Sequence, residues 1–419
     1  MYQFSNKHEG EIKMQFKNRL IFILLLLFST SLFCCTTAII TGKNTVDGRP
    51  ILVKHRDSSF EQNKLMYFSD GKFNYIGLVN SKDVYGDEVW GGSNSAGFAI
   101  MNSASYNLKV DSDTTTLVDK EGVIMKLALQ QCETLEDFEK LLDELPKPLG
   151  VEANFGVIDA KGGCAYYECD NFTYTKIDAN NPNIAPFGYI IRTNYSFNGN
   201  QDDGYGYIRY LTAEKLFYNA IASNNLDYQF VLQEMSRCLD HSLTDVHLPN
   251  EITSRNETKF VPLQDYIVRN SSVSTILVHG VKPDENPDLT TIWTILGFPL
   301  TSVATPSWVG AGENLPNCIV ADKSGNASLC ANSVLLKNKC FPIKRGSGKK
   351  YLNLSVVMNK EGEGFYQKIK PFEDEIILNT KARMKKWRSN GHIAKQEALS
   401  FYRSLDVSVD TFFRELLSN

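Results

Sequence analysis

Short strand-like runs alternate along the chain with stretches whose apolar residues recur at helical spacing. We predict strands at residues 75–79, 97–102, 155–159, 164–168, 189–193 and 273–279. We predict helices at residues 120–131, 134–145, 208–222 and 226–238, and a charged helical tail from about residue 372. Strands occur in hairpins and helices in pairs, so this order indicates antiparallel sheets with helices outside, an α+β sandwich in one domain.

The helix predicted at residues 134–145 carries a clear start signal. Thr134 and Asp137 have the spacing of a capping box, in which each side chain binds a backbone N–H of the other residue. Leu135, Phe138 and Leu141 then form one apolar stripe. We therefore expect one face of this helix to be buried.

Residues 36–57 have the clearest hairpin pattern. Two strand-like runs flank Asp47 and Gly48, a pair that is favoured in tight hairpin turns. Pairing about this turn brings residues 54–57, with the sequence Lys-His-Arg-Asp, back alongside the residues that follow Cys35. The hairpin therefore delivers charged groups to the neighbourhood of Cys35 by geometry alone.

An apolar run at residues 20–33 closely follows Lys17 and Arg19. Its length matches the apolar core of a signal peptide and is short for a membrane span of about 20 residues. We read residues 1–34 as a signal peptide, with Met14 as a more ordinary start than the polar first 13 residues provide. No later segment is apolar enough to span a membrane, so we expect an exported protein of the periplasm, cell surface or medium, without stable membrane insertion.

The chemistry of signal cleavage decides what Cys35 can do. A cut after Cys34 places the thiol of Cys35 in the same residue as a newly freed α-amine, so one residue supplies nucleophile and base. The alternative is lipidation, because residues 32–35 partly match a lipoprotein signal. Lipidation of Cys35 blocks its thiol, and lipidation of Cys34 leaves Cys35 without a free amine. The bulky Phe33 departs from the lipoprotein pattern, so we favour ordinary cleavage.

Composition excludes several classes of partner. The formal net charge is −4, and the signal peptide takes more basic than acidic residues with it, so nucleic acid is not an expected partner. The nine cysteines include no Cys-x-x-Cys pair and no zinc spacing, and we predict neither a metal nor another cofactor. Export permits disulfides, and Cys318, Cys330 and Cys340 are close enough in sequence to form one, although spacing does not fix a pairing.

Four segments together resemble the cysteine N-terminal-nucleophile (Ntn) hydrolases. Residues 35–57 read Cys-Thr-Thr-x6-Asn-x2-Asp-Gly-x5-Lys-His-Arg-Asp, which resembles the opening of choloylglycine hydrolases, penicillin V acylases, acid ceramidase-like amidases and isopenicillin-N acyltransferases. Residues 92–106, 154–168 and 188–197 resemble later segments of the same families. The similarity covers residues 35 to about 220, and more loosely extends to Val309, and it is strongest for the acyltransferase and linear-amide hydrolase branch.

The resemblance implies a fold and a catalytic pair. The fold is a four-layer αββα sandwich of two antiparallel sheets flanked by helices, with the nucleophile at the head of a central strand. Cys35 would attack an amide carbonyl as a thiolate, and its α-amine would act as general base. Asp57 matches the carboxylate that orients this amine. Lys54 stands where several relatives carry arginine; it lowers a thiol pKa as a point charge but lacks the planar guanidinium, and Arg56 shares its face by alternation.

Three further site residues follow from the resemblance. Asn194, in Arg-Thr-Asn, matches the asparagine that donates a hydrogen bond to the oxyanion. Arg209, in Gly-Tyr-Ile-Arg-Tyr, resembles the arginine at a helix start that pairs with the catalytic carboxylate. Asn102 is a more distant match to a second polar group near the nucleophile. Taken alone, each has a plain structural reading as a turn asparagine or a surface arginine.

The sequence thus predicts an exported cysteine amidase or acyltransferase that cleaves a linear N-acyl amide through a thioester at Cys35. Two alternatives stay open: a dipeptidase-type Ntn hydrolase, and a lipid-anchored surface binding protein without catalysis. Relatives are often oligomeric, so a homo-oligomer is a further expectation. Trp90 is one of several aromatic residues that can line an acyl pocket, although packing is the simpler reading. The acyl group and the amine are not fixed by the sequence.

Overall fold

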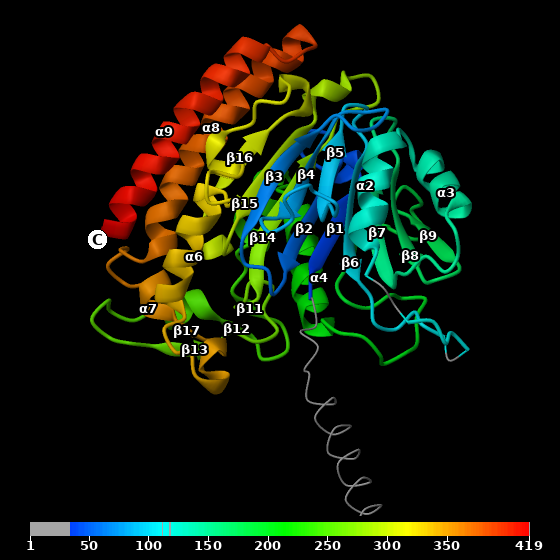
Figure 1. Cartoon of the computed structure of the whole chain (residues 1–419). Helices are drawn as coiled ribbons and strands as arrows, with labels where there is room; N and C mark the ends of the chain where they lie inside the picture. Colours follow the sequence, from blue (N-terminus) through cyan, green and yellow to red (C-terminus); the bar gives the residue numbers. More distant parts are fainter. Residues whose placement is uncertain (1–33, 111, 117–118, 419) are drawn as a thin grey trace, which may run out of the picture. The chain divides into compact units, whose positions relative to one another are not determined.

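The computed structural model describes residues 34–110, 112–116 and 119–418, and the chain from Cys34 onward forms one compact unit. Apart from Cys34, the predicted signal peptide with Met14 lies outside the described residues. Two large antiparallel sheets form the centre of the unit, and helices pack on them (Figure 1).

The first sheet has six strands in the order β10-β1-β2-β14-β15-β16. They are β1 (Thr36–Ile40), β2 (Ile51–Asp57), β10 (Tyr189–Arg192), β14 (Ser272–His279), β15 (Thr291–Leu296) and β16 (Ala304–Ser307). β1 and β2 form the predicted hairpin, in which Thr36 lies opposite His55 and Thr37 opposite Lys54. Because β10 and β14 pair on either side, this hairpin occupies the interior of the sheet.

The second sheet has seven strands that follow one another in chain order. They are β3 (Asn63–Phe68), β4 (Tyr75–Asn80), β5 (Gly91–Asn94), β6 (Ala99–Ala104), β7 (Ala153–Ile158), β8 (Cys164–Cys169) and β9 (Tyr174–Asp178). Its inner face packs on the first sheet, where the Tyr166 hydroxyl donates to Thr37 Oγ1 at 2.8 Å. Gly156 permits a close approach there, since a Cβ at this position would collide with Met101 and press on Ile39.

Helices cover the outer faces of both sheets. α2 (Glu121–Gln131) and α3 (Leu135–Glu144) pack on the second sheet, whereas α4 (Tyr207–Ala222), α6 (Ser328–Cys340) and α8 (Phe365–Asn390) pack on the first, and α9 (Lys395–Ser418) contacts α6 (Figure 1). Shorter elements include α5 (Tyr228–Phe230), a π-helix (Val231–Met235), α7 (Leu354–Val357), β11 (Asp240–His241) with β12 (Val246–His247), and β13 (Phe260–Pro262) with β17 (Tyr351–Asn353). The α+β arrangement of two antiparallel sheets flanked by helices is thus confirmed.

Most predicted elements are present, with their ends shifted by a few residues. The capping box of α3 forms as expected, because Thr134 Oγ1 accepts from the Asp137 N–H at 3.3 Å and the Asp137 carboxylate accepts from the Thr134 N–H at 3.1 Å. Among the strands of the two large sheets, the predicted ranges did not include β3, β5, β9, β15 and β16, and the predicted helices did not include α6. All nine cysteines are free thiols, so the disulfide that export permits among Cys318, Cys330 and Cys340 is not formed.

Residues 226–238 differ most from the prediction, because a π-helix replaces the later turns of the expected α-helix. The backbone N–H of Ser236 donates to Val231 O, five residues back, at 3.0 Å. The carbonyl of Leu232, which an α-helix would use instead, accepts from Arg237 Nη1 at 2.6 Å. A side chain thus takes the acceptor that a regular α-helix needs.

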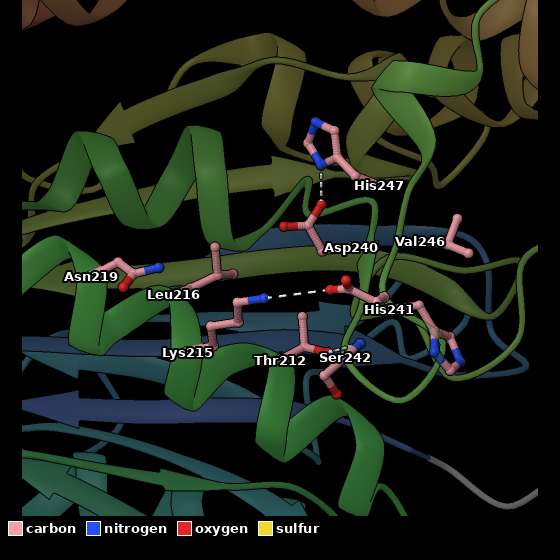
Figure 2. A pocket seen from close by; sticks show the side chains of 10 residues that line it. Thr212, Lys215, Leu216, Asn219, Asp240, His241, Ser242, Val246 and His247 are labelled. Carbon is pink, nitrogen blue, oxygen red and sulfur yellow. Dashed lines mark hydrogen bonds and ion pairs between the residues drawn. The ribbon is translucent and has the colours of Figure 1, made fainter.

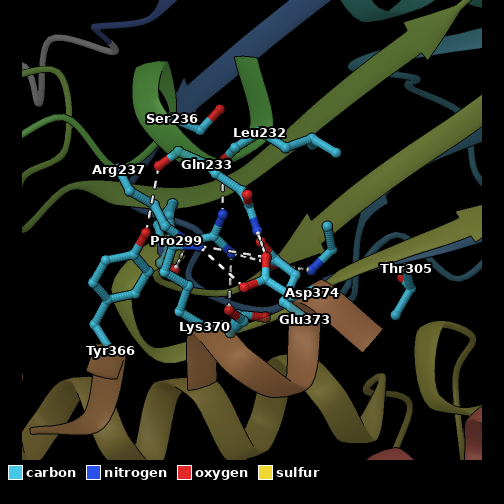
Figure 3. A network of polar contacts seen from close by, with 12 residues as sticks. Leu232, Gln233, Ser236, Arg237, Pro299, Thr305, Tyr366, Lys370, Glu373 and Asp374 are labelled. Atoms are coloured by element: carbon cyan, nitrogen blue, oxygen red, sulfur yellow. Dashed lines mark hydrogen bonds and ion pairs between the residues drawn. The ribbon is translucent and has the colours of Figure 1, made fainter. Parts of the chain in front are cut away.

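Arg237 also ties this π-helix to the C-terminal helices (Figure 3). Its guanidinium forms an ion pair with Glu373 of α8, and both side chains are about 1% exposed. Glu373 accepts a further hydrogen bond from the N–H of Ala304 at 2.6 Å, and Arg237 Nε donates to Pro299 O at 2.9 Å. The pair therefore joins α8, the π-helix and the edge strand β16 in one buried network.

Candidate active site

Cys35 immediately precedes β1, which lies in the interior of the first sheet, and its side chain is buried. Continuing the register of β1 and β2 by one residue places Cys35 beside Arg56. Across an antiparallel pair, residues that lie opposite each other point to the same face. Cys35 therefore shares a face with Arg56, and by alternation with Thr37 and Lys54.

This shared face looks toward the second sheet. Thr37 receives the hydrogen bond of Tyr166 from β8, and Lys54 Nζ donates to Asn102 Oδ1 of β6 at 2.5 Å. Three predicted site residues, Cys35, Lys54 and Asn102, are thus brought together between the sheets. Asn102, the most distant of the matches, has a definite place as the acceptor for Lys54.

Lys54 is a buried cation beside the thiol, with only 1% of its surface exposed. Burial lowers the pKa of its ammonium to about 8, and the neighbouring Cys35 thiol acts in the opposite direction because a thiolate favours the charged lysine. The ammonium also lies 5.4 Å from the ring centre of Trp90. Lys54 therefore places a positive charge close to the Cys35 side chain.

Arg56 reinforces Lys54 on the same face, as alternation predicted. Its guanidinium donates to Asn63 Oδ1 at 2.6 Å and to Asn80 Oδ1 at 3.0 Å, and it lies 4.9 Å from the ring centre of Trp90. Burial lowers the pKa of Arg56 to about 10, and proximity to Cys35 again opposes this shift. Lys54 has no guanidinium group, and Arg56 supplies one on the same face of the strand, two residues later.

On the opposite face of β2, Asp57 accepts hydrogen bonds from Nε and Nη2 of Arg269 and from Oγ of Ser272. Arg269 Nε donates to Asp57 Oδ2 at 3.0 Å, and Ser272 Oγ donates to Asp57 Oδ1 at 2.7 Å. Arg269 Nη2 reaches further and donates to the carbonyl oxygen of Cys34 at 2.8 Å. One guanidinium therefore links Asp57 to the peptide group of Cys34 and Cys35, the bond that must be cut to free the amine of Cys35.

His55 is buried next to this network and makes stability depend on pH. Its ring contacts Ser272 Oγ at 2.8 Å and Thr275 Oγ1 at 3.2 Å, and burial lowers its pKa from 6.5 to about 4. In this pH range the unfolded chain binds a proton at His55 and the folded chain does not, so the free energy of unfolding decreases as the pH falls from about 6.5 toward 4.

We expect His55→Gln to remove about 2 kcal/mol of the difference in the free energy of unfolding between about pH 7.5 and about pH 5, measured by urea unfolding. The exposed His392→Gln is the control; an equal pH dependence in His55→Gln and wild type would contradict the assignment.

Arg209 lies in the first turn of α4 and is completely buried. It donates to the carbonyl oxygen of Cys35, to Thr36 Oγ1 at 2.9 Å and to Asn194 Oδ1 at 2.8 Å. Its expected pairing with the catalytic carboxylate is therefore corrected in part: among the described residues Arg269 forms the ion pair with Asp57, and Arg209 holds the backbone of Cys35. Burial lowers the pKa of Arg209 to about 10, and repulsion from Arg269 adds to this.

Asn194 follows β10 and is held in one orientation. Its Oδ1 accepts from Arg209, and its Nδ2 donates to Ala104 O at 2.9 Å, so the two ends of the amide are distinguished by their partners. Gly206 allows this contact, because a Cβ at this position would collide with the Arg209 guanidinium. Arg209 therefore connects the backbone of Cys35 to the amide predicted to stabilise the oxyanion.

The prediction of site residues did not include two charged residues of this region. Arg269 precedes a predicted strand, and only the pairing of β14 with β2 shows that it meets Asp57. Glu121 starts α2, where an acidic residue is ordinary, yet it is buried and within electrostatic reach of Lys54. Burial raises the pKa of Glu121 well above its usual value, and a hydrogen bond and the charge of Asp119 raise it further.

A separate small hollow of about 90 Å³ lies between α4 and the β11–β12 hairpin (Figure 2). It contains none of the predicted site residues, and its ion pair of His247 with Asp240 is half exposed. Across the part of the chain that the structure describes, no group of three or more histidine, cysteine or acidic side chains is arranged to hold a metal ion. No helix within the same residues is both long and apolar enough to cross a membrane.

No family model and no curated protein matches this sequence. Among solved structures, the chain is similar to an N-acylethanolamine-hydrolyzing acid amidase ortholog from Caenorhabditis elegans, with 13% identity, coverage of 60% of this chain and 94% of that one, and a TM-score of 0.40. It is also similar to a penicillin V acylase from Agrobacterium tumefaciens, with 12% identity, coverage of 66% and 85%, and a TM-score of 0.38. A mutant conjugated bile acid hydrolase from Clostridium perfringens gives 12% identity, coverage of 65% and 91%, and a TM-score of 0.35.

Proposed function

We propose that the mature chain begins at Cys35 and is an exported cysteine amidase or acyltransferase acting on linear amides. The observation that carries the proposal is the contact of Arg269 with both Asp57 and the Cys34 carbonyl. Through one guanidinium it connects the Asp57 carboxylate to the peptide group whose nitrogen becomes the α-amine of Cys35 after cleavage. The thiol of the same residue lies on the face of Lys54 and Arg56, so nucleophile and base are each supplied with a partner.

The reaction follows from these positions in two halves. The Cys35 sulfur attacks the amide carbonyl carbon while its α-amine takes the thiol proton, and the carbonyl oxygen becomes an oxyanion. The C–N bond then breaks, the α-amine passes its proton to the leaving amine, and a thioester remains on Cys35. Water or a second amine attacks the thioester, gives a proton to the α-amine, and releases the acyl group as the sulfur regains that proton.

The remaining side chains have supporting roles in this proposal. Asn194 is the candidate oxyanion donor, worth a few kcal/mol in sites of this kind, and Arg209 fixes the orientation of its amide. Lys54 supplies a positive charge beside the Cys35 sulfur, and Asn102 positions Lys54 through its Oδ1. Asp57 and Arg269 act as positioning residues on the amine side.

Asp57→Asn is expected to lower kcat/KM roughly 10²–10³-fold, because the α-amine loses the charged acceptor that orients it. Removing this negative charge also leaves Arg269 uncompensated beside the amine, which lowers the amine pKa. The acidic limb of the kcat/KM profile, where the base becomes protonated, should therefore move to lower pH. The measurement is a pH profile on any N-acyl amide that the wild type cleaves.

Asp47→Asn is the matched control for this variant. Asp47 is a carboxylate at the far end of the same hairpin, where it pairs with Arg49 and His279. We expect Asp47→Asn to lower stability and to leave the acidic limb in place. An Asp57→Asn enzyme with an unchanged limb and unchanged kcat/KM would remove Asp57 from the mechanism.

A further inference from the structure

We infer that the amide cleaved at Cys35 carries a carboxylate, and that this carboxylate binds to Lys54 and Arg56 beside the thiol. The inference rests on the proposed function, because it assigns the substrate class of the same site. It distinguishes anionic amides, such as N-acyl amino acids, from neutral amides of simple amines.

The first support is a pair of buried cations that form no ion pair within the described residues. Lys54 and Arg56 are 1% and 4% exposed, and the hydrogen-bond acceptors that they contact are the neutral side-chain amides of Asn102, Asn63 and Asn80. Within residues 34–110, 112–116 and 119–418, neither cation forms an ion pair with a carboxylate. Burial of a charge is costly unless an opposite charge compensates it.

Other buried arginines of this chain follow that rule. Arg237 pairs with Glu373, Arg192 pairs with Glu168 at 2.7 Å, and Arg269 pairs with Asp57. Arg209, on the opposite face of the sheet, is an exception: it forms no ion pair within the described residues and donates to the backbone of Cys35 instead. The cluster of Lys54 and Arg56 is therefore exceptional in facing the reactive side chain with two charges.

The nearest buried acid does not provide the missing charge. Glu121 lies within electrostatic reach of Lys54 and of Cys35, but burial and Asp119 favour its neutral form. A Cys35 thiolate balances one of the two cations and disappears when the thioester forms. A substrate carboxylate supplies the second negative charge and remains after acylation when it belongs to the acyl group.

The second support is a set of hydrogen-bond donors that remain available. The Nε1–H of Trp90 is buried and has no partner among the described residues, and both cations lie against the Trp90 ring. Lys54 has three N–H donors and Arg56 has five, of which one and two are used by the asparagines. Two cationic donors beside an indole donor favour an anionic oxygen acceptor, and a carboxylate matches the arginine fork.

The test compares two thiol reagents of similar size on the mature enzyme, iodoacetate and iodoacetamide. We expect Cys35 to favour the anionic reagent by about tenfold or more relative to the preference of free cysteine, since an attraction of about 1.4 kcal/mol gives a factor of ten. Peptide mass mapping separates the label on Cys35 from any label on the other cysteines that remain after signal removal. The preference should fall toward that of free cysteine in Lys54→Met and in about 1 M salt.

Lys64→Met is the matched control, because Lys64 is also a buried lysine and donates to Ser81 O at 3.2 Å. It should keep the preference for iodoacetate. Reaction of Cys35 with both reagents in the ratio of free cysteine would overturn the carboxylate inference and leave the proposed function standing. Failure of Cys35 to react with either reagent would instead count against the proposed nucleophile.

Competition then locates the carboxylate within the substrate. Protection of Cys35 by an N-acyl amino acid, and not by its methyl ester, places the carboxylate on the amine side. Protection by a dicarboxylic acid monoamide, and not by its methyl ester, places it on the acyl side. Equal protection by the acids and by their neutral esters overturns the inference.

Discussion

Cys35→Ala is expected to lower kcat for amide cleavage by at least about 10⁴-fold, because no other group in the proposed site can form the thioester. The fold should persist, since Cys35 precedes β1 and an alanine fills less space at the same position without a new polar group. Turnover of an N-acyl amide and far-UV circular dichroism are the two measurements. A folded Cys35→Ala protein with wild-type turnover would show that another residue is the nucleophile.

Cys132→Ala provides the control for removal of a thiol. Cys132 is a buried cysteine that ends α2, and it belongs to the cluster between this helix and the second sheet. Its loss should cost about 1 kcal/mol of stability through the small cavity that it leaves. Turnover should be unchanged, which separates the chemistry of Cys35 from a general effect of losing a cysteine.

Glu373→Leu is expected to lower the free energy of unfolding by about 3–5 kcal/mol, the largest loss of stability predicted for a single change in this chain. The reason is that Arg237 would stay buried without its counter-charge, and the N–H of Ala304 would lose its acceptor. The helix α8 and the strand β16 would lose their shared anchor. Urea unfolding of the variant and the wild type measures the difference.

Two further variants make this test specific. Lys370 of α8 forms a half-exposed ion pair with Asp374, the neighbour of Glu373. Lys370→Ala removes this pair and should change the free energy of unfolding by no more than about 0.5 kcal/mol. The double variant Arg237→Met with Glu373→Leu removes both buried charges and should regain a large part of the loss. A double variant as unstable as Glu373→Leu alone would show that the unpaired Arg237 is not the cause.

The sequence predicted the local part of the site well, because the relevant distances are set by one hairpin. The turn at Asp47 and Gly48 and the two-residue period of a strand suffice to place Lys54 and Arg56 on the face of Cys35. The capping box of α3 is equally local. Predictions of this kind depend only on residues that are close in sequence.

The parts that were missed depend on neighbours that are distant in sequence. Arg269 reaches Asp57 because β14 pairs with β2, and the sequence does not state which strands are adjacent. The role of Arg209 was misjudged in part for the same reason, since two arginines compete for the surroundings of Asp57. The buried state of Glu121 follows from the packing of α2 on the second sheet, which an acidic residue at a helix start does not indicate.

The proposed mechanism of Cys35 depends most directly on where the mature chain begins. Intact mass and N-terminal sequencing of the exported protein measure this in one experiment. We predict a chain that starts at Cys35 with an unmodified amine and thiol. A start at any other residue, or an added mass of roughly several hundred daltons from a lipid on Cys34 or Cys35, would contradict the proposed mechanism.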